Sequence, residues 1–326
     1  MIKRITNKVR SLAIDASYQL NLLPHLIGKK SNHIILMYHG VLPGNAKQFN
    51  TRHQFLKDFV NQIKYFKTHC HIISVKDFCE GKFVPGKQNI ALTFDDGYLN
   101  NYKYAFPVLE EYKAPATFYI TGLNNTNCNI LWPDFLEIAT QLTSQPISIQ
   151  NQLYIKQNNI YIEEKTKEPL YAIIRKKDFQ FKNDMIEAFD KHIVDFRNIG
   201  DFDGYWKLMS DDQIKEVGHS KYIKIGSHGY YHNNLGEIKI EDAIEEMQLS
   251  KNYLEKLVPY KIDEIAYPDG SYSKEVALEA LKLGLKYQLL ISYKSDDDKN
   301  IKSLYERFGI YPCESNANQI LAALKN

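Results

Sequence analysis

The sequence has no run of 18 apolar residues anywhere in its 326 positions, so it predicts no transmembrane helix. Net charge is also small, because 41 basic side chains stand against 39 acidic ones. Nucleic-acid-binding proteins usually carry a clear basic excess, and we therefore expect no nucleic-acid partner. Charged residues make up 25% of the chain and apolar residues 44%, a balance that excludes collagen-like, coiled-coil and disordered chains and predicts a globular fold.

Cysteine is scarce as well. The few cysteines lie too far apart for a zinc knuckle and are too few for a dense disulfide framework. We therefore interpret them as reduced structural thiols. They are Cys70, Cys79, Cys128 and Cys313.

Residues 1–30 begin with basic side chains, as a signal peptide does, but polar residues such as Asp15 interrupt the apolar stretch that a signal peptide needs. Apolar residues recur every three or four positions up to Leu23, which predicts an amphipathic helix that Pro24 stops or kinks. Two interpretations stay open, a helix packed on the domain or a basic interfacial helix in peripheral contact with an anionic membrane. We expect a cytoplasmic protein, in the second case at the inner membrane face.

Strand-like and helix-like segments alternate along most of the chain. Short continuous apolar runs predict buried parallel strands, and segments with a helical apolar period predict the helices between them. This alternation is typical of a parallel barrel or a doubly wound sheet. The predicted strands are Ile34–Tyr38, Ile90–Phe94, Ala116–Thr121, Ile223–Ile225, Glu264–Tyr267 and Tyr287–Ile291, and the predicted helices lie near 55–66, 104–109 and 241–257.

One segment breaks this alternation. Between positions 147 and 162, apolar and polar residues alternate around Asn158-Asn159, which predicts an antiparallel hairpin or small meander. Polar, helix-compatible sequence follows it. We therefore expect roughly 143–205 to be a small β-rich and helical insertion in a loop of the main domain, which spans 31–326.

Several predicted strands are followed directly by polar residues. In parallel α/β folds the carboxyl ends of the strands build the active site. Asp95-Asp96-Gly97 follows one strand, and adjacent carboxylates at a strand end point in different directions, so one can bind a metal while the other stays a free base. Taken alone, such a pair is more often a turn or a helix cap.

Two histidines, His228 and His232, follow a later strand. Four residues apart on a helical turn, they share a face within reach of one ion. With one carboxylate they form a set that suits Zn²⁺ or a similar ion and leaves positions open for water and substrate. The turn Tyr267-Pro268-Asp269-Gly270 follows another strand, and His39 follows the first one. Each of these two features alone is more often structural.

Taken together, these segments resemble the polysaccharide deacetylases of the NodB-homology type, carbohydrate esterase family 4. The matching motifs are Thr93-Phe94-Asp95-Asp96-Gly97, Ser227-His228 with His232, and Tyr267-Pro268-Asp269-Gly270. The resemblance covers roughly 33–312 without the insertion. It implies a distorted (β/α)7 barrel that removes N-acetyl groups from an N-acetylhexosamine-containing glycan or lipid-linked saccharide, giving acetate and a free amino sugar.

The resemblance also implies roles for single residues. Asp95 corresponds to the general base of the family. The ligands of a divalent metal would be Asp96, His228 and His232, with Zn²⁺ as the default ion and Co²⁺, Ni²⁺ or Mn²⁺ as alternatives. The backbone N–H of Tyr98 is expected to bind the oxyanion. The substrate would also meet the third motif, at Tyr267, Pro268 and Asp269.

This chain departs from the family pattern in two places. Many members carry arginine in the third motif, where this chain has Ala266, and a late histidine that acts as the general acid. No histidine follows His232 here. The chain looks like the subgroup of biofilm poly-N-acetylglucosamine deacetylases, in which an early Tyr-His segment supplies the acid. We therefore assign the acid role to His39.

Two other functions stay open. A de-O-acylase or amidase on another acylated substrate could use the same metal site, which does not distinguish an ester from an amide. A non-catalytic glycan-binding barrel could also keep the fold. The intact carboxylates and histidines argue against the second alternative, while Ala266 and the missing late histidine argue mildly for it.

Overall fold

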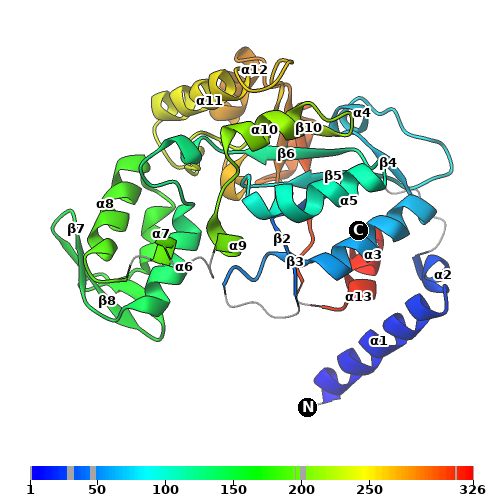
Figure 1. Cartoon of the computed structure of the whole chain (residues 1–326), viewed down its shortest axis with the longest axis horizontal. Coiled ribbons are helices and arrows are strands. Elements are labelled where there is room, and N and C mark those ends of the chain that lie inside the picture. The colour runs from blue at the N-terminus through cyan, green and yellow to red at the C-terminus, as the bar shows by residue number, and fades with distance from the viewer. Residues whose placement is uncertain are drawn as a thin grey trace.

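A parallel sheet forms the centre of the molecule, and a smaller unit lies at one side of it, as the computed structural model shows (Figure 1). The structure describes residues 2–27, 33–44, 49–194, 196–198, 203–312 and 314–325. Cys313 and small parts of the predicted segments 1–30 and 143–205 lie outside these residues. The cysteines within them carry free thiols: Cys70, Cys79 and Cys128.

Within the described residues, eight parallel strands form a nearly closed barrel in the order β13-β12-β11-β10-β6-β5-β1-β14, and β4 pairs with β5 beside this path. The predicted α/β barrel is thereby confirmed, with eight strands along its path. The bounds are β1 Ile34–Tyr38, β4 His71–Ile73, β5 Asn89–Phe94, β6 Ala116–Ile120, β10 Ile223–Ser227, β11 Glu264–Ala266, β12 Tyr287–Leu290, β13 Leu304–Glu306 and β14 Phe308–Gly309, with a separate pair β2 Val41–Leu42 and β3 Gln54–Phe55.

The two ends of this sheet meet at a single residue. β13 and β14 lie at opposite edges of the sheet, yet only Arg307 separates them in the chain. Because consecutive Cα atoms are about 3.8 Å apart, the two edges approach each other to within about 8 Å there. The chain thus crosses the open seam of the barrel at Arg307.

Side chains alternate between the two faces of each strand. On β5, Leu92 and Phe94 pack outward into the main core between the sheet and its helices, whereas Ala91 joins a small cluster inside the barrel. The helices are α3 Leu56–His69, α4 Val75–Cys79, α5 Phe106–Glu111, α10 Asp211–Gly218, α11 Ile240–Leu254, α12 Lys274–Lys282 and α13 Asn316–Lys325, with a π-helical turn η1 Asn101–Ala105 and short 3-10 turns η2 Leu123–Asn125, η5 Pro268–Gly270 and η6 Asp296–Asn300.

The predicted hairpin is confirmed as a three-stranded antiparallel sheet. Asn158 and Asn159 both adopt positive φ, at 48° and 61°, as the tight turn between two twisted strands requires. This sheet and its helices enclose a hydrophobic core of their own, which also takes in Phe49. The elements are α6 Trp132–Leu142, β7 Ile147–Ile149, β8 Gln152–Gln157, β9 Ile160–Glu163, α7 Leu170–Ile174, α8 Phe179–Asp190, η3 Phe196–Asn198 and α9 Asp203–Trp206.

The N-terminal segment forms two helices, α1 Ile2–Gln19 and α2 Leu23–Ile27. The prediction of one helix ending near Leu23 at Pro24 was wrong. The break comes earlier, at Asn21 with φ 56°, and Pro24 lies in the first turn of α2, where proline costs no hydrogen bond. Among the described helices, none is long and apolar enough to cross a membrane.

Candidate metal centre and active site

The strand geometry of β5 brings both carboxylates of the Asp pair to the mouth of the barrel. Asp95 continues the inward-facing positions of Ala91 and Thr93, so it points into the barrel. The next residue would point outward, but Asp96 takes φ 77° and Gly97 also takes φ 77°, which turns the chain back at the strand end. Both aspartates are buried, and they line one cavity of about 140 Å³.

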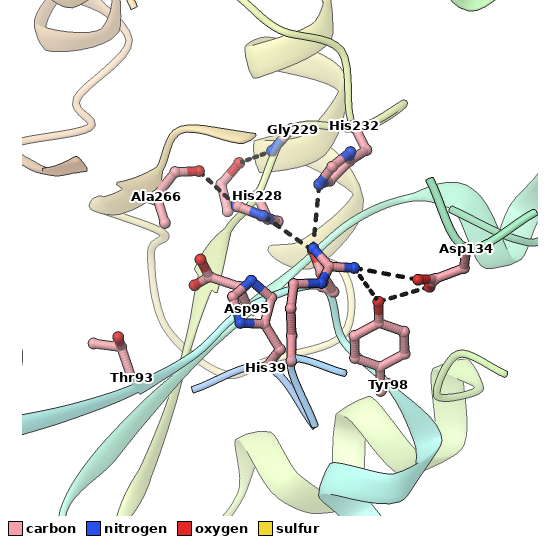
Figure 2. A network of polar contacts seen from close by, with 12 residues as sticks. His39, Thr93, Asp95, Tyr98, Asp134, His228, Gly229, His232 and Ala266 are labelled. Atoms are coloured by element: carbon pink, nitrogen blue, oxygen red, sulfur yellow. Dashed lines mark hydrogen bonds and ion pairs between the residues drawn. The ribbon is translucent and has the colours of Figure 1, made fainter. Parts of the chain in front are cut away.

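Asp96, His228 and His232 lie together in that cavity. The Nε2 atoms of His228 and His232 each lie 3.3 Å from Oδ1 of Asp96. The ligand atoms of the three residues all lie within 4.8 Å of one another, and all three residues are buried. Figure 2 shows the two imidazoles directed at the same space, with Asp95 and His39 facing it. The structure thus brings together the three residues predicted as metal ligands.

The surroundings of this triad suit a divalent metal. Nδ1 of His228 lies 2.7 Å from the Ala266 carbonyl, so it donates the ring proton there and leaves Nε2 free to bind an ion. The second carboxylate oxygen of Asp96 is buried and finds no hydrogen-bond partner among the described residues. Two nitrogens and one carboxylate oxygen are the donor set of many catalytic zinc sites. The residues therefore fit a divalent metal.

Asp95 is held by an arginine that the sequence did not predict. Arg307 donates from Nη1 to Oδ1 of Asp95 at 2.6 Å and from Nη2 to Oδ2 at 2.8 Å, a bidentate pair of two buried side chains. Burial alone would raise the pKa of Asp95, but the charges of Arg307 and His228 outweigh it and lower that pKa below its ordinary value. Asp95 is therefore ionised and fixed in orientation.

The site contains an arginine although the third motif has none, because Arg307 reaches Asp95 from a different part of the chain. At that motif this chain has Ala266, whose backbone carbonyl orients His228. Arg307 instead enters from the seam between β13 and β14, and its guanidinium lies 5.7 Å from the ring of Tyr119 inside the barrel. The sequence offered little signal for this residue, because β13 and β14 on either side of it are only three and two residues long.

His39 follows β1 and lines the same cavity as Asp95 and the metal triad. Its backbone carbonyl accepts a hydrogen bond from Asn101, and its Nδ1 is buried without a partner among the described residues. Burial and the nearby charge of Arg52 lower the pKa of His39 to about 4. The imidazole is therefore neutral at pH 7 in the resting protein.

Tyr98 belongs to a buried polar network beside the triad. Its hydroxyl donates to Asp134 at 2.6 Å, and Asp134 also accepts from Asn50 at 2.8 Å and from Arg52 at 3.2 Å. Figure 2 shows the pair of Tyr98 and Asp134 next to the metal site. The Tyr98 side chain thus anchors the start of α6. These side-chain contacts do not involve its backbone N–H, for which oxyanion binding stays a prediction.

The third motif lies at the rim of the cavity. Tyr267 is buried, lines the cavity and donates its hydroxyl to Gln288, so it belongs to both core and site. Pro268 starts a 3-10 turn in which Asp269 adopts φ 57°. Asp269 is partly exposed and pairs with Arg175, which follows α7, at 2.7 Å. This ion pair ties the smaller unit to the barrel at the entrance of the site.

A second cavity, of about 800 Å³, opens beside the first. Arg52, Pro133 and Tyr171 line both cavities, so the two are contiguous. The larger cavity lies between α6 and the antiparallel sheet, where Lys156 and Tyr161 reach it from β8 and β9. The smaller unit therefore provides most of the wall that leads to the metal triad.

Comparison with known proteins agrees with this geometry. A sequence model described as polysaccharide deacetylase matches residues 83–288. A poly-beta-1,6-N-acetyl-D-glucosamine N-deacetylase of Staphylococcus aureus is 32% identical over 111 residues, which are 29% of this chain and 38% of that protein. YxkH of Bacillus subtilis, named as a polysaccharide deacetylase, is 33% identical over 93 residues, 27% of this chain and 31% of its own length. The matches span about a third of these curated relatives.

Solved structures share the fold over most of the chain. IcaB from Ammonifex degensii aligns with a TM-score of 0.54 at 17% identity and covers 91% of this chain and 99% of its own. The deacetylase PplD from Streptococcus pyogenes aligns with a TM-score of 0.52 at 17% identity, over 90% of this chain and 98% of its own. At this level of identity the alignments establish the barrel fold.

Proposed function

The chain belongs to the polysaccharide deacetylase family, and from this premise we propose that it removes N-acetyl groups from an N-acetylhexosamine-containing glycan or lipid-linked saccharide, giving acetate and a free amino sugar. The observation that carries the proposal is the buried triad of Asp96, His228 and His232 beside the separate, arginine-held carboxylate of Asp95. Such a set provides three metal ligands and one base within one cavity. This is what hydrolysis of an acetamide requires.

In the proposed mechanism, Asp96, His228 and His232 hold the metal, for which Zn²⁺ is the expected ion. A divalent ion held there would supply Lewis-acid chemistry, by polarising the acetamide carbonyl and lowering the pKa of water. Asp95 accepts the proton of the attacking water, and Arg307 keeps that carboxylate ionised and oriented. The backbone N–H of Tyr98 stabilises the developing oxyanion.

His39 completes the proposed cycle as the general acid for the leaving amine. Since burial lowers the pKa of His39 to about 4, the ring is neutral at rest and has to take up a proton during the cycle before it can donate one. Its place in the same cavity as Asp95 supports this role. Tyr267, Pro268 and Asp269 form the rim against which the sugar would rest.

The contiguous cavities support an oligomeric substrate rather than a single sugar. The inner cavity of about 140 Å³ holds the reacting groups, while the outer one of about 800 Å³ has room for further sugar residues. Its wall offers the ring of Tyr171 as a stacking surface and polar groups such as Gln141 and Lys156 for hydroxyl groups. We therefore propose that a chain of N-acetylated sugars lies along the smaller unit.

The test is release of free amine and acetate from N-acetylglucosamine oligomers by the purified protein, with chelator and then with added Zn²⁺. Release that chelator abolishes and zinc restores supports the proposal. No release by protein that holds a full equivalent of metal would indicate a different acylated substrate. No release and no bound metal would instead indicate a glycan-binding barrel.

A further inference from the structure

Over residues 8–19, the outward face of α1 carries apolar side chains, while its inward face combines Ile14 and Tyr18 with several polar side chains. Toward α13, Ser11 and Asp15 hydrogen-bond with Asn318, and Asp15 also contacts Ser315. Of the aliphatic side chains on this part of the helix, Ile14 is buried there. Surface helices of water-facing proteins usually show the reverse arrangement, with the apolar stripe against the body.

The exposed apolar side chains of α1, with Leu20 directly after its end, form one continuous stripe. Val9 and Leu12 are each 60% exposed and Leu20 is 67% exposed, and Ala13 and Ala16 lie exposed between them. At 3.6 residues per turn these five positions fall within about 100° of the helix circumference. Past the helix end, Leu22 and Leu26 are also exposed, at 47% and 44%. Figure 1 shows α1 projecting from the barrel.

Basic residues border the stripe on both sides. Lys8 and Arg10 are exposed and lie about 100° to either side of Val9 on the helix. Residues 1–30 contain six basic side chains and one acidic one, a formal +5, whereas the whole chain carries +2 and the other 296 residues therefore −3. The single acid, Asp15, faces α13 and not the stripe.

We propose that this face of α1 docks the protein on an anionic lipid surface. A helix lying in the interface places its apolar stripe among the acyl chains while basic residues at its flanks reach the headgroups. A second copy of the chain is a poorer occupant, because pairing two such faces brings Lys8 and Arg10 of each copy against like charges. This proposal combines the two interpretations of residues 1–30. One face of α1 packs on α13, and the other face would lie on the membrane.

The experiment is flotation of the full chain with vesicles of phosphatidylcholine alone and with 30% phosphatidylglycerol, a probe of anionic lipid. We expect binding to the anionic vesicles and at least about tenfold weaker binding to the neutral ones. The triple variant Val9→Asn, Leu12→Asn, Leu20→Asn should lose binding about tenfold or more. Lys8→Glu with Arg10→Glu should lose it while keeping the apolar stripe.

The matched control removes exposed apolar side chains elsewhere, by Val194→Asn with Leu278→Asn, which are 73% and 57% exposed. This variant should bind vesicles like the unchanged protein, and all variants should keep the same circular dichroism spectrum and unfolding temperature. No vesicle binding by the unchanged protein, or equal binding by the triple variant, overturns the proposal. A dimer that the triple variant abolishes, without vesicle binding, would identify a second copy as the occupant.

Discussion

In the proposed mechanism single residues have separate roles, and the two adjacent aspartates are the clearest case. Asp95→Asn should remove the base and keep the metal, because Asp96, His228 and His232 are untouched. His228→Ala should lose both metal and activity. We expect deacetylation to fall by about 10²–10⁴ in the first variant with a full equivalent of zinc retained. Metal analysis beside acetate release checks this, and equal metal loss in both variants would contradict the division of roles.

A second prediction at this scale concerns the pair of Arg307 and Asp95. Arg307→Met should destabilise the protein by about 3–5 kcal/mol, because it leaves a buried carboxylate without its partner. Adding Asp95→Asn should recover much of that loss, since the uncompensated charge is then gone. Urea unfolding of the two single variants and the double variant, all in chelator, measures the coupling. Additive losses would show that the pair does not act as a unit.

The residues differ in how far the sequence could predict them. Asp96, His228 and His232 follow apolar strands whose ends must meet, so their approach to one another follows from local pattern and topology. Arg307 could not be predicted in this way, because β13 and β14 are three and two residues long. Its contact with Asp95 depends on where the sheet closes, which is a property of the whole barrel.

Among the elements, α7 lies where the smaller unit borders both cavities. Tyr171 on α7 lines both cavities and its ring lies 5.1 Å from that of Trp132. Tyr171→Ala should raise KM for an N-acetylglucosamine tetramer about tenfold, with a smaller effect on a dimer, because a stacking surface for outer sugars is lost. Tyr171→Phe keeps the ring and should behave like the unchanged protein. Steady-state kinetics on both oligomers decide, and an equal effect on dimer and tetramer would argue against outer sugar binding.

Strands buried on both faces could be predicted one by one from the sequence, as β5 illustrates. A short, continuous apolar run is typical of such a strand. The break between α1 and α2 could not be predicted, because the apolar spacing continues past Asn21. The helix ends there because Asn21 adopts a positive φ. The core that α6 shares with the antiparallel sheet could not be predicted either. It joins a segment with helical apolar spacing to strands with alternating apolar residues.

At the scale of the whole molecule, buried neutral histidines link folding to pH. Burial lowers the pKa of His39 to about 4 and that of His53 to about 3, from 6.5 in the unfolded chain. Between pH 6.5 and 4 the folded state therefore binds fewer protons than the unfolded state, so stability falls as the pH drops through this range. Each group contributes a slope that rises from about half of 1.4 kcal/mol per pH unit at pH 6.5 to about 1.4 kcal/mol per pH unit near pH 5.

Urea unfolding at pH 7, 6 and 5 in chelator measures this dependence. His53→Asn should reduce the slope of the unfolding free energy against pH by the contribution of one buried histidine. Replacement of the exposed His219 serves as the control. A slope unchanged by His53→Asn would contradict a buried neutral imidazole at that position.

The position of Arg307 near the end of the chain also means that the site residues are synthesised well apart from one another. All three metal ligands have emerged once residue 232 has been made, but the partner of Asp95 follows 75 residues later, with the strands that close the sheet. A growing or C-terminally trimmed chain therefore holds the elements of an ion site before it holds an oriented base. The orientation of Asp95 therefore depends on the segment that closes the sheet, so any base chemistry at that carboxylate would depend on a completed barrel.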